Sequence, residues 1–492
     1  MNWFLRFFEM LTRMGWLVLI PILLTLCGTV MGLRFGASLR YAIRVAAALF
    51  GLNLMLNSLG SSLSSAVAEI TVNHQLALEI TDAGWSASSA IASASRINLW
   101  ILPLYIAINW VMLLSRATRT LNLDLWNLWH VAFMGAMVER LTDSIAYGMA
   151  AAAAMSVMIM VFSDRCGWRM ARYCQLSGAS VANGFAAAAI PFGLLVESLL
   201  NLIPGRPRLV LDRSTEPQES LASPAAWSLV LGAVMGILAG RDIYGVAQLA
   251  MTFAALAFLA PYLGQALSVA FYPFAEAVAD FSQRKLKIKG SVYLGLSPTS
   301  TLGSGTVVVV TLMVTPIITF LAGSIPGNRF VAQGDIVMLP YIIAVIVMVC
   351  RGDLVRSLLA GVLASATMLW CASSLAELFT ISAVTANAEL YEGMGTISNF
   401  CDGGNPMAWA AVQAGSYGIA GMTCLIVLAI TLAVWNRNRI VTGADVANLK
   451  RRVRRVEAAE VSAPAAAPAA PANDPAAGRG AASGGENTGA GI

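Results

Sequence analysis

Long apolar stretches separated by short polar segments make up most of the chain. Stretches long enough to cross the roughly 30 Å of bilayer hydrocarbon recur near residues 15–33, 41–60, 97–114, 128–162, 185–203, 226–240, 245–272, 305–323, 336–350, 355–380 and 412–435. Since backbone polar groups inside lipid must be satisfied within the chain, each stretch is predicted to be helical. The pattern predicts an all-α polytopic membrane protein with roughly ten to twelve passes.

Composition agrees with a membrane protein and excludes other classes. The 492 residues are 58% hydrophobic and 12% charged, whereas about 25% of residues are charged in soluble domains. The net charge of +5 comes from basic residues spread over short loops, which indicates membrane orientation and argues against a nucleic-acid partner. With two histidines and seven cysteines that form no CxxC motif, we predict no metal site and no cofactor.

The two ends of the chain differ from its middle. The N-terminus has basic residues before its first apolar run and no A-x-A-like cleavage site after it, which predicts an interfacial start and an uncleaved first span. The Lys/Arg cluster between Arg437 and Arg455 predicts a cytoplasmic C-terminus. Beyond about Ala463 the chain is rich in Ala, Pro and Gly, and we predict disorder. The division is a transmembrane domain, 1–440, and a cytoplasmic basic segment with a disordered tail, 441–492.

Polar breaks recur in the same order in both halves, which predicts an internal repeat over about 15–210 and 226–435. The breaks are TDAGWSASSA (81–90), LDLWN (123–127) and LSGASVANG (176–184), then GLSPTSTLGSG (295–305), GDLVR (352–356) and NFCDGGNP (399–406). Exposed backbone of this kind is tolerated in a membrane only where it is buried in protein or lines a cavity. Ordinary extramembrane loops are the alternative.

An unusual number of polar residues falls within one predicted helix of the first half. Asn127 and His130 are about one turn apart and share a face. Glu139 and Asp143 lie on roughly the opposite side and are expected to pack with Arg140 or a neighbouring helix. Ionisable groups inside membranes are usually functional, so His130 is a candidate ligand-binding residue. A buried, hydrogen-bonded structural histidine is the alternative.

Several of these segments resemble one transporter family. DAGWSASSA, RATRTLNLDLWNLWH, IPFGLLVESLLNLIPG, GILAGRDIYGVAQLA and GGNPMAW are similar to the galactitol-specific IIC (EIIC) membrane component of the bacterial phosphoenolpyruvate-dependent phosphotransferase system (PTS). The resemblance extends to about Arg439. It implies two inverted repeats of about five helices each, with a core domain and a V-shaped dimerisation domain that move by an elevator mechanism.

The resemblance also implies a function. Such a permease translocates galactitol or a related polyol or sugar, which a separate cytoplasmic IIB subunit, served by IIA, phosphorylates. It implies a homodimer in the bacterial inner membrane and no phosphorylated catalytic residue on this chain. A transporter of the same fold uncoupled from phosphorylation, working as a facilitator or symporter, is the alternative. A membrane scaffold is a third possibility, against which the paired polar breaks argue.

The chain departs from the family pattern in the breaks themselves. Members of the family usually carry histidine, aspartate and histidine at the positions of Asn183, Ser297 and Ser304. Amides and hydroxyls still bind a polyol because they donate and accept hydrogen bonds. The substitutions remove groups able to take a proton from a sugar hydroxyl, which leaves the substrate and the coupling to phosphorylation open.

The predicted substrate site lies near the bilayer midplane between the two sets of breaks. A polyol that sheds water on binding needs a partner for each hydroxyl. The candidate residues are Asp82, Trp85, Ser88, His130, Asn183, Glu197, Ser297, Asp402 and Asn405. Asp82 and Asp402 each lie close to glycine, where backbone can approach a ligand. The alternative for both is that they cap helix ends.

Overall fold

The computed structural model describes residues 15–203, 208–211, 223–285 and 292–443. The predicted interfacial start falls largely outside these ranges, and the predicted disordered tail falls wholly outside them. Within them the chain is helical apart from connections and five strands of two to four residues. The prediction of an all-α polytopic membrane protein is confirmed, while the inverted orientation of the repeats stays a prediction.

The first half runs from a short helix into a very long one and then through alternating strands and helices. Its elements are α2 (Trp16–Val30), α3 (Phe35–Asn73), β1 (Thr81–Asp82), α4 (Trp85–Ala94), α5 (Asn98–Leu114), β2 (Thr120–Asn122), α6 (Trp129–Thr142), α7 (Ile145–Ser163), α8 (Gly167–Tyr173), β3 (Ala179–Val181) and α9 (Ile190–Leu200). Two 3₁₀-helices, η1 (Leu125–Leu128) and η2 (Ala186–Ala189), lead into α6 and α9.

The second half repeats this order. Its elements are α10 (Pro224–Leu238), α11 (Ile243–Arg284), β4 (Tyr293–Leu296), α12 (Gly305–Leu321), α13 (Leu339–Val349), α14 (Leu354–Ala386), α15 (Ala388–Tyr391), β5 (Ile397–Ser398), α16 (Pro406–Ser416) and α17 (Gly418–Thr442). The 3₁₀-helices are η3 (Pro298–Thr301), η4 (Ala322–Ser324) and η5 (Asp335–Met338).

The order of elements corrects one detail of the predicted repeat. Asp124 comes directly before η1 and α6, and Asp335 begins η5, which leads into α13 in the same way. The order of the breaks LDLWN and GDLVR pairs Asp353 with Asp124, but Asp353 instead caps α14 through a hydrogen bond from the Arg356 backbone N–H. An Asp-Leu dipeptide shared by two breaks is weak evidence for a match, because aspartate caps many helices.

Each predicted apolar stretch falls on a helix, but not every one of these helices is long enough to cross a membrane by itself, so the number of passes stays a prediction. In the described part of the chain, six helices are long and apolar enough to cross a membrane, or seven if α4 and α5, bent by 92°, form one broken span. Four further apolar helices have 10–17 residues. At about 1.5 Å per residue, helices this short fall short of 30 Å.

The predicted long helix near residue 130 is two helices. Asp143 has φ 48° in the left-handed region and ends α6, and Ser144 then caps α7 by accepting a hydrogen bond from the Tyr147 N–H. A short polar residue tolerates this backbone conformation better than the apolar residues around it. The chain therefore reverses direction between the two helices.

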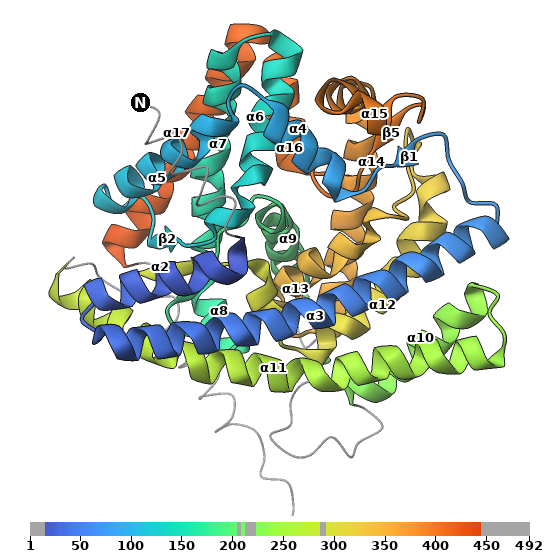
Figure 1. Cartoon of the computed structure of the whole chain (residues 1–492), viewed down its shortest axis with the longest axis horizontal. Helices are drawn as coiled ribbons and strands as arrows, with labels where there is room; N and C mark the ends of the chain where they lie inside the picture. Colours follow the sequence, from blue (N-terminus) through green and yellow to red (C-terminus); the bar gives the residue numbers. More distant parts are fainter. Residues whose placement is uncertain (1–14, 204–207, 212–222, 286–291, 444–492) are drawn as a thin grey trace, which may run out of the picture. The chain divides into compact units, whose positions relative to one another are not determined.

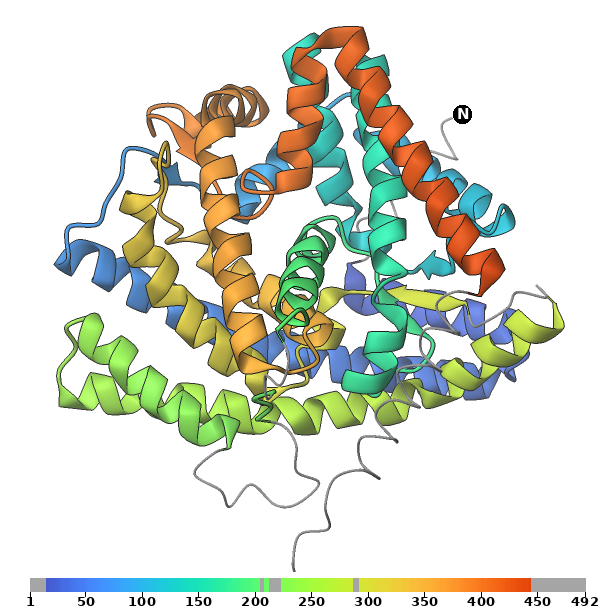
Figure 2. The same ribbon diagram turned by 180° about the vertical axis from the view of Figure 1, so that it is seen from behind.

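The long helices α3 and α11 lie side by side across the lower part of Figure 1, with α2 packed on α3 and α10 on α11. The remaining helices lie on one side of this pair, as the reverse view in Figure 2 also shows. Asp242 begins α11 with a side-chain cap on the Gly245 N–H. The pair α3 and α11 thus forms a platform for the polar breaks.

Two small parallel sheets join the halves at the breaks. Strand β4 of the second half lies between β2 and β3 of the first, and β1 pairs with β5. Asn122 and Ser180 both align with Gly295. A Cβ on Gly295 would lie 3.0 Å from the Cβ of Ala182 and 2.9 Å from Oδ1 of Asn122, so the absent side chain lets the strands approach. The sheets fix the breaks of both halves next to one another.

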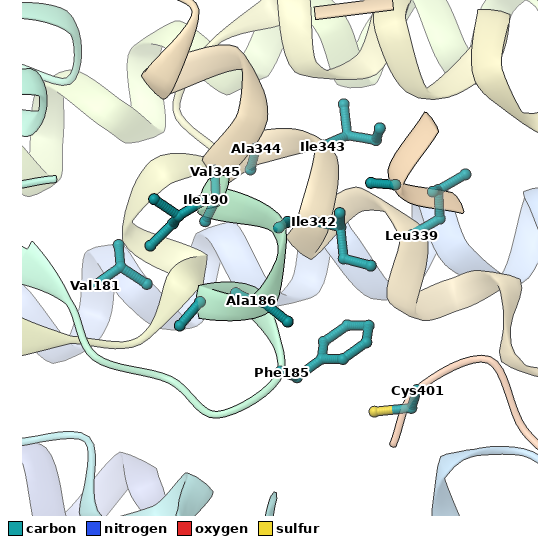
Figure 3. Close-up of a cluster of buried hydrophobic side chains, with 14 of the residues drawn as sticks. Val181, Phe185, Ala186, Ile190, Leu339, Ile342, Ile343, Ala344, Val345 and Cys401 are labelled. Carbon is teal, nitrogen blue, oxygen red and sulfur yellow. The ribbon is translucent and has the colours of Figure 1, made fainter. Parts of the chain in front are cut away.

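The core beneath the breaks is apolar. Figure 3 shows η2 and the start of α9 beside α13, with Ile190 and Ile342 among the buried side chains. In the same view Phe185 points toward the segment that carries Cys401. Inside a membrane such helices are held together by close van der Waals packing and not by removal from water, and this packing gives the polar segments a rigid base.

Candidate functional site

A cavity of about 460 Å³ lies between α3 and the polar breaks. Its size falls within the range of small-molecule sites. It is lined by Ile20, Leu49, Asn53, Leu56, Asn57, Ser61, Trp85, Asp124, Trp129, His130, Asn183, Phe185, Ser297, Pro298, Thr299, Val337, Met338 and Tyr341. Amides, hydroxyls, carboxylate, imidazole and aromatic rings therefore face one space.

Helix α3 supplies one wall. Asn53, Asn57 and Ser61 follow one another at intervals of four residues and so lie along one face. The Asn57 amide donates to Oδ1 of Asn53 at 3.2 Å. Apolar Leu49 and Leu56 line the same wall, so this part of the cavity is both polar and apolar.

The breaks supply the opposite wall. Asn183 lies just before η2, and its Oδ1 accepts from the N–H groups of Phe185 and Ala186 at 3.0 and 2.9 Å. Ser297 lies 3.1 Å from the hydroxyl of Thr299. The Asn183 amide NH₂ and the two hydroxyls are groups that can bond a ligand. Local backbone capping fixes where these side chains point.

The closest ionisable pair at the cavity is His130 and Asp402. The His130 Nδ1 lies 2.8 and 3.1 Å from the two carboxylate oxygens of Asp402. His130 is 2% exposed and Asp402 is fully buried. His130 lines the cavity and Asp402 lies behind it. Aromatic rings flank the imidazole, with centroids 3.8 Å away at Trp129 and 5.9 Å away at Phe185.

The loop before α16 positions Asp402. The Cys401 N–H donates to Asp335 at 2.6 Å, and Asn405 caps α16 while its amide donates to the Gly184 carbonyl at 3.0 Å. A Cβ on Gly184 would lie 2.8 Å from the Cβ of His130. Glycine is needed at this position, since it lets the first-half break pass directly over His130.

The structure brings most of the predicted site residues together. Trp85, His130, Asn183 and Ser297 line the cavity. Asp402 and Asn405 support it from behind. Ser88 is buried and accepts from the Asn399 amide at 2.7 Å, so it supports the break without lining the cavity. Two predicted residues, Asp82 and Glu197, lie elsewhere.

Asp82 holds a backbone turn. Its carboxylate accepts from the N–H groups of Gly84, Gln333 and Asp335 at 2.9–3.0 Å. Burial raises the pKa of Asp82, and these backbone donors oppose the rise. The geometry matches the capping role that the sequence left as the alternative for this residue.

Glu197 belongs to an ion network. Its carboxylate pairs with Arg169 at 3.0 Å, with Arg208 at 3.8 Å and with Arg351. Arg169 also stacks over Trp168 at 4.4 Å. No atom of this network lines the cavity described above. It ties α8 and α9 to the connection between α13 and α14.

Of the two predicted partners for Glu139 and Asp143, Arg140 or a neighbouring helix, the structure shows the second. Arg96, at the bend between α4 and α5, bonds Glu139 at 2.5 Å and Asp143 at 3.2 Å. Ser95 also donates to Glu139. These groups line a second cavity of about 410 Å³ at the far end of α6 from His130. The predicted division of this helix into two polar regions therefore corresponds to two cavities.

Several lining residues escaped the prediction. Asn53, Asn57 and Ser61 recur every four residues within an apolar helix, which is visible in the sequence. Such spacing indicates a helix face that lines a water-filled cavity. Thr299 and Tyr341 gave no comparable signal, because their approach to the cavity depends on how η3 and α13 pack. Asp124, which lies in the predicted break LDLWN but was not among the candidate site residues, also lines the cavity.

Three side chains at the site are of kinds that ligate metals. His130, Cys401 and Asp402 each offer one ligand atom within 4.8 Å of the others. In the structure, however, Asp402 accepts the hydrogen bond from the imidazole, and a metal would compete with that bond. Burial also raises the pKa of the Cys401 thiol, which disfavours the thiolate that binds metals. The arrangement favours a hydrogen-bonded dyad.

Comparison with known proteins gives a consistent result. Residues 11–393 match the family model described as PTS system sugar-specific permease component. The chain is 29% identical over 432 residues to the "PTS system galactitol-specific EIIC component" of Escherichia coli (strain K12). The aligned region covers 87% of this chain and 95% of the relative. The protein of the same name from Escherichia coli O157:H7 matches to the same extent.

Proposed function

This chain belongs to the family of PTS sugar-specific permease components, and from that premise we propose that its substrate is a sugar alcohol of the galactitol class. The polyol binds in the cavity between α3 and the breaks. A separate soluble subunit phosphorylates it. The observation that carries this proposal is the convergence of amide, hydroxyl and imidazole groups from both halves on one cavity of about 460 Å³.

The chemistry of the lining supports a polyol. Each hydroxyl of such a ligand is both donor and acceptor, and so are the amides and hydroxyls of Asn53, Asn57, Ser61 and Thr299. The Trp85 and Trp129 rings lie 6.2 Å apart and offer apolar faces for the carbon skeleton. Satisfying each buried hydroxyl avoids a penalty of about 1–3 kcal/mol.

The distribution of charge supports a cytoplasmic C-terminus in this multi-pass protein. The end of α17 lies against the ends of α5 and α7, because the Asn436 amide donates to the Ala117 carbonyl and to Asp164. Five arginines belong to these ends or the residues beside them: Arg116, Arg119, Arg165, Arg437 and Arg439. Basic residues favour the cytoplasmic side. An alkaline phosphatase fused after Ile492 should be inactive, and periplasmic activity there would contradict this orientation.

The partners follow from the family. We propose phosphoryl transfer from a soluble IIB subunit, itself served by IIA, since this chain brings no phosphocarrier residue to the cavity. The cavity lining of the described chain contains no cysteine, and its histidine is paired with Asp402. The predicted homodimer and elevator movement rest on the family resemblance and stay predictions.

Uptake by inside-out and right-side-out vesicles tests the proposal. Labelled galactitol should accumulate as a phosphate ester only when phosphoenolpyruvate and the carrier proteins are present. Accumulation of free galactitol without them would favour the uncoupled transporter. Failure of every tested polyol to enter would contradict the substrate class.

A further inference from the structure

We propose that His130, held by Asp402, is the general base that takes the proton from the polyol hydroxyl during phosphoryl transfer. The assignment rests on the proposed function, because it requires a polyol in the cavity. It also answers a question raised by the sequence, because the family resemblance implies ionisable residues where this chain has Asn183, Ser297 and Ser304.

The hydrogen bond to Asp402 fixes the state of the imidazole. An ionised carboxylate only accepts hydrogen bonds, so the neutral ring must carry its proton on Nδ1, 2.8 Å from Asp402. The Nε2 lone pair is then free to accept a proton. No hydrogen bond from the described residues to Nε2 is seen, and His130 lines the cavity.

The surroundings hold the ring in this orientation. Trp129 packs on it at a centroid distance of 3.8 Å and 34°, and Phe185 stacks at 5.9 Å and 25°. The backbone of Gly184 lies close to the root of the side chain, since a Cβ on Gly184 would lie 2.8 Å from the His130 Cβ. A ring packed against two aromatic side chains and bonded at Nδ1 has little freedom to turn, and a positioned base requires a fixed ring.

Other groups fit the role less well. His74, at the end of α3, has Nε2 3.0 Å from the Leu238 carbonyl and does not line the cavity. Asp124 does line it, but a carboxylate is a weaker base than an imidazole at neutral pH. Tyr341 is a phenol and is protonated at that pH.

The charges around the dyad favour the protonated intermediate. Negative groups stabilise an imidazolium once it forms, and Asp402 is in direct contact with His130. The titratable groups near the dyad are Asp402 and Cys401 from the loop before α16, Asp335 from η5, Asp124 before η1 and Tyr341 from α13.

The proposed step balances. The polyol oxygen forms a bond to the phosphorus of a phosphorylated cysteine or histidine on the soluble donor. The bond between phosphorus and the donor sulfur or nitrogen breaks, and the donor residue keeps the electron pair. The hydroxyl proton moves to Nε2 of His130, and later passes to the departing donor residue or to water.

The test separates binding from transfer. In the full-length protein, His130→Gln keeps a polar group and should lower the rate of single-turnover phosphoryl transfer from the phosphorylated donor by about 10²- to 10⁴-fold. Its galactitol Kd, measured by equilibrium dialysis without donor, should change by less than about tenfold, the cost of one neutral hydrogen bond. His74→Gln is the matched control and should leave both quantities unchanged.

Two further measurements distinguish a base from a structural residue. The wild-type transfer rate should fall at low pH, because a protonated imidazole cannot take the hydroxyl proton, and this dependence should be absent in His130→Gln. In His130→Ala, added imidazole should restore part of the rate. A His130→Gln transfer rate within threefold of wild type, or an unchanged pH profile, would overturn the assignment. Absence of wild-type galactitol binding would overturn the proposed function and this assignment with it.

Discussion

Two ion pairs in this molecule are alike in burial and distance but differ in their surroundings. His130 with Asp402 and Arg169 with Glu197 each join a buried cation-forming side chain to a buried carboxylate, at 2.8 and 3.0 Å. One partner of the first pair lines a cavity, whereas neither partner of the second does. A buried charge in a membrane protein is therefore a candidate for function only when one of its groups has space for a ligand.

The difference extends to how each charge is balanced. Glu197 pairs with three arginines, so the network depends on its carboxylate. Asp402 pairs with a histidine, whose imidazole can be neutral or protonated and donates the Nδ1 hydrogen bond in both states. The first pair can change protonation during a reaction cycle, while the second is suited to hold helices together.

The largest effect on stability is expected for Glu197→Gln. Removing the carboxylate leaves buried Arg169 and its neighbours uncompensated, and breaking a buried pair in this way costs about 3–5 kcal/mol. Unfolding of the purified protein by heat or denaturant should shift strongly, whereas galactitol affinity of the folded fraction stays near wild type. Glu389→Gln, at an exposed residue of α15, is the control. Weakened binding at normal stability would reverse the roles of the two pairs.

A smaller stability effect is expected for Asp402→Asn. The amide oxygen can still accept the Nδ1–H of His130 and leaves no buried charge unpaired, so the loss should be about 1 kcal/mol. Thermal unfolding beside Glu197→Gln measures the contrast directly. Equal destabilisation of the two variants would show that both pairs are structural in the same sense.

Asn57→Ala sharpens the comparison from the other wall of the cavity. Its amide is exposed on α3, and loss of one neutral hydrogen bond to a ligand costs about 0.5–1.5 kcal/mol, or roughly 2- to 12-fold in affinity. Equilibrium dialysis with galactitol measures it, with Ser58→Ala as the control on the same helix. No change in Kd would place the polyol away from α3.

The smallest effect is a dependence of stability on pH at the end of α7. Asp164 accepts hydrogen bonds from Thr118, Thr120 and Asn436, yet burial raises its pKa from 3.8 to about 6. The folded state thus binds the proton more tightly than the unfolded state, and Asp164 lowers stability as pH rises from about 4 to about 6. Asp164→Asn should flatten unfolding midpoints over that range, and an unchanged slope would contradict the assignment.

Sequence patterns were sufficient for the helices and for part of the site. Apolar runs determine helices in a membrane because the backbone has few alternatives there. The breaks predicted Asn183 and Ser297, and the polar residues of one helix predicted His130. The pairing of Glu139 with Arg96 could not be predicted, because it depends on the bend between α4 and α5. The contribution of Asn53 from α3 depends on packing between distant segments. Glu197 was wrongly expected to line the site, because the sequence does not show whether a cavity lies next to a charged residue.

Equilibrium binding of labelled galactitol to the purified chain, with no phosphocarrier present, tests the central claim most directly. The informative variant is Asn53→Trp, which should fill the cavity from α3. Its neighbour Leu54 is 54% exposed and lies outside the cavity lining, so Leu54→Trp adds the same bulk elsewhere. The account predicts saturable binding to wild type and Leu54→Trp and loss of binding in a folded Asn53→Trp protein. Wild-type affinity in Asn53→Trp would contradict it.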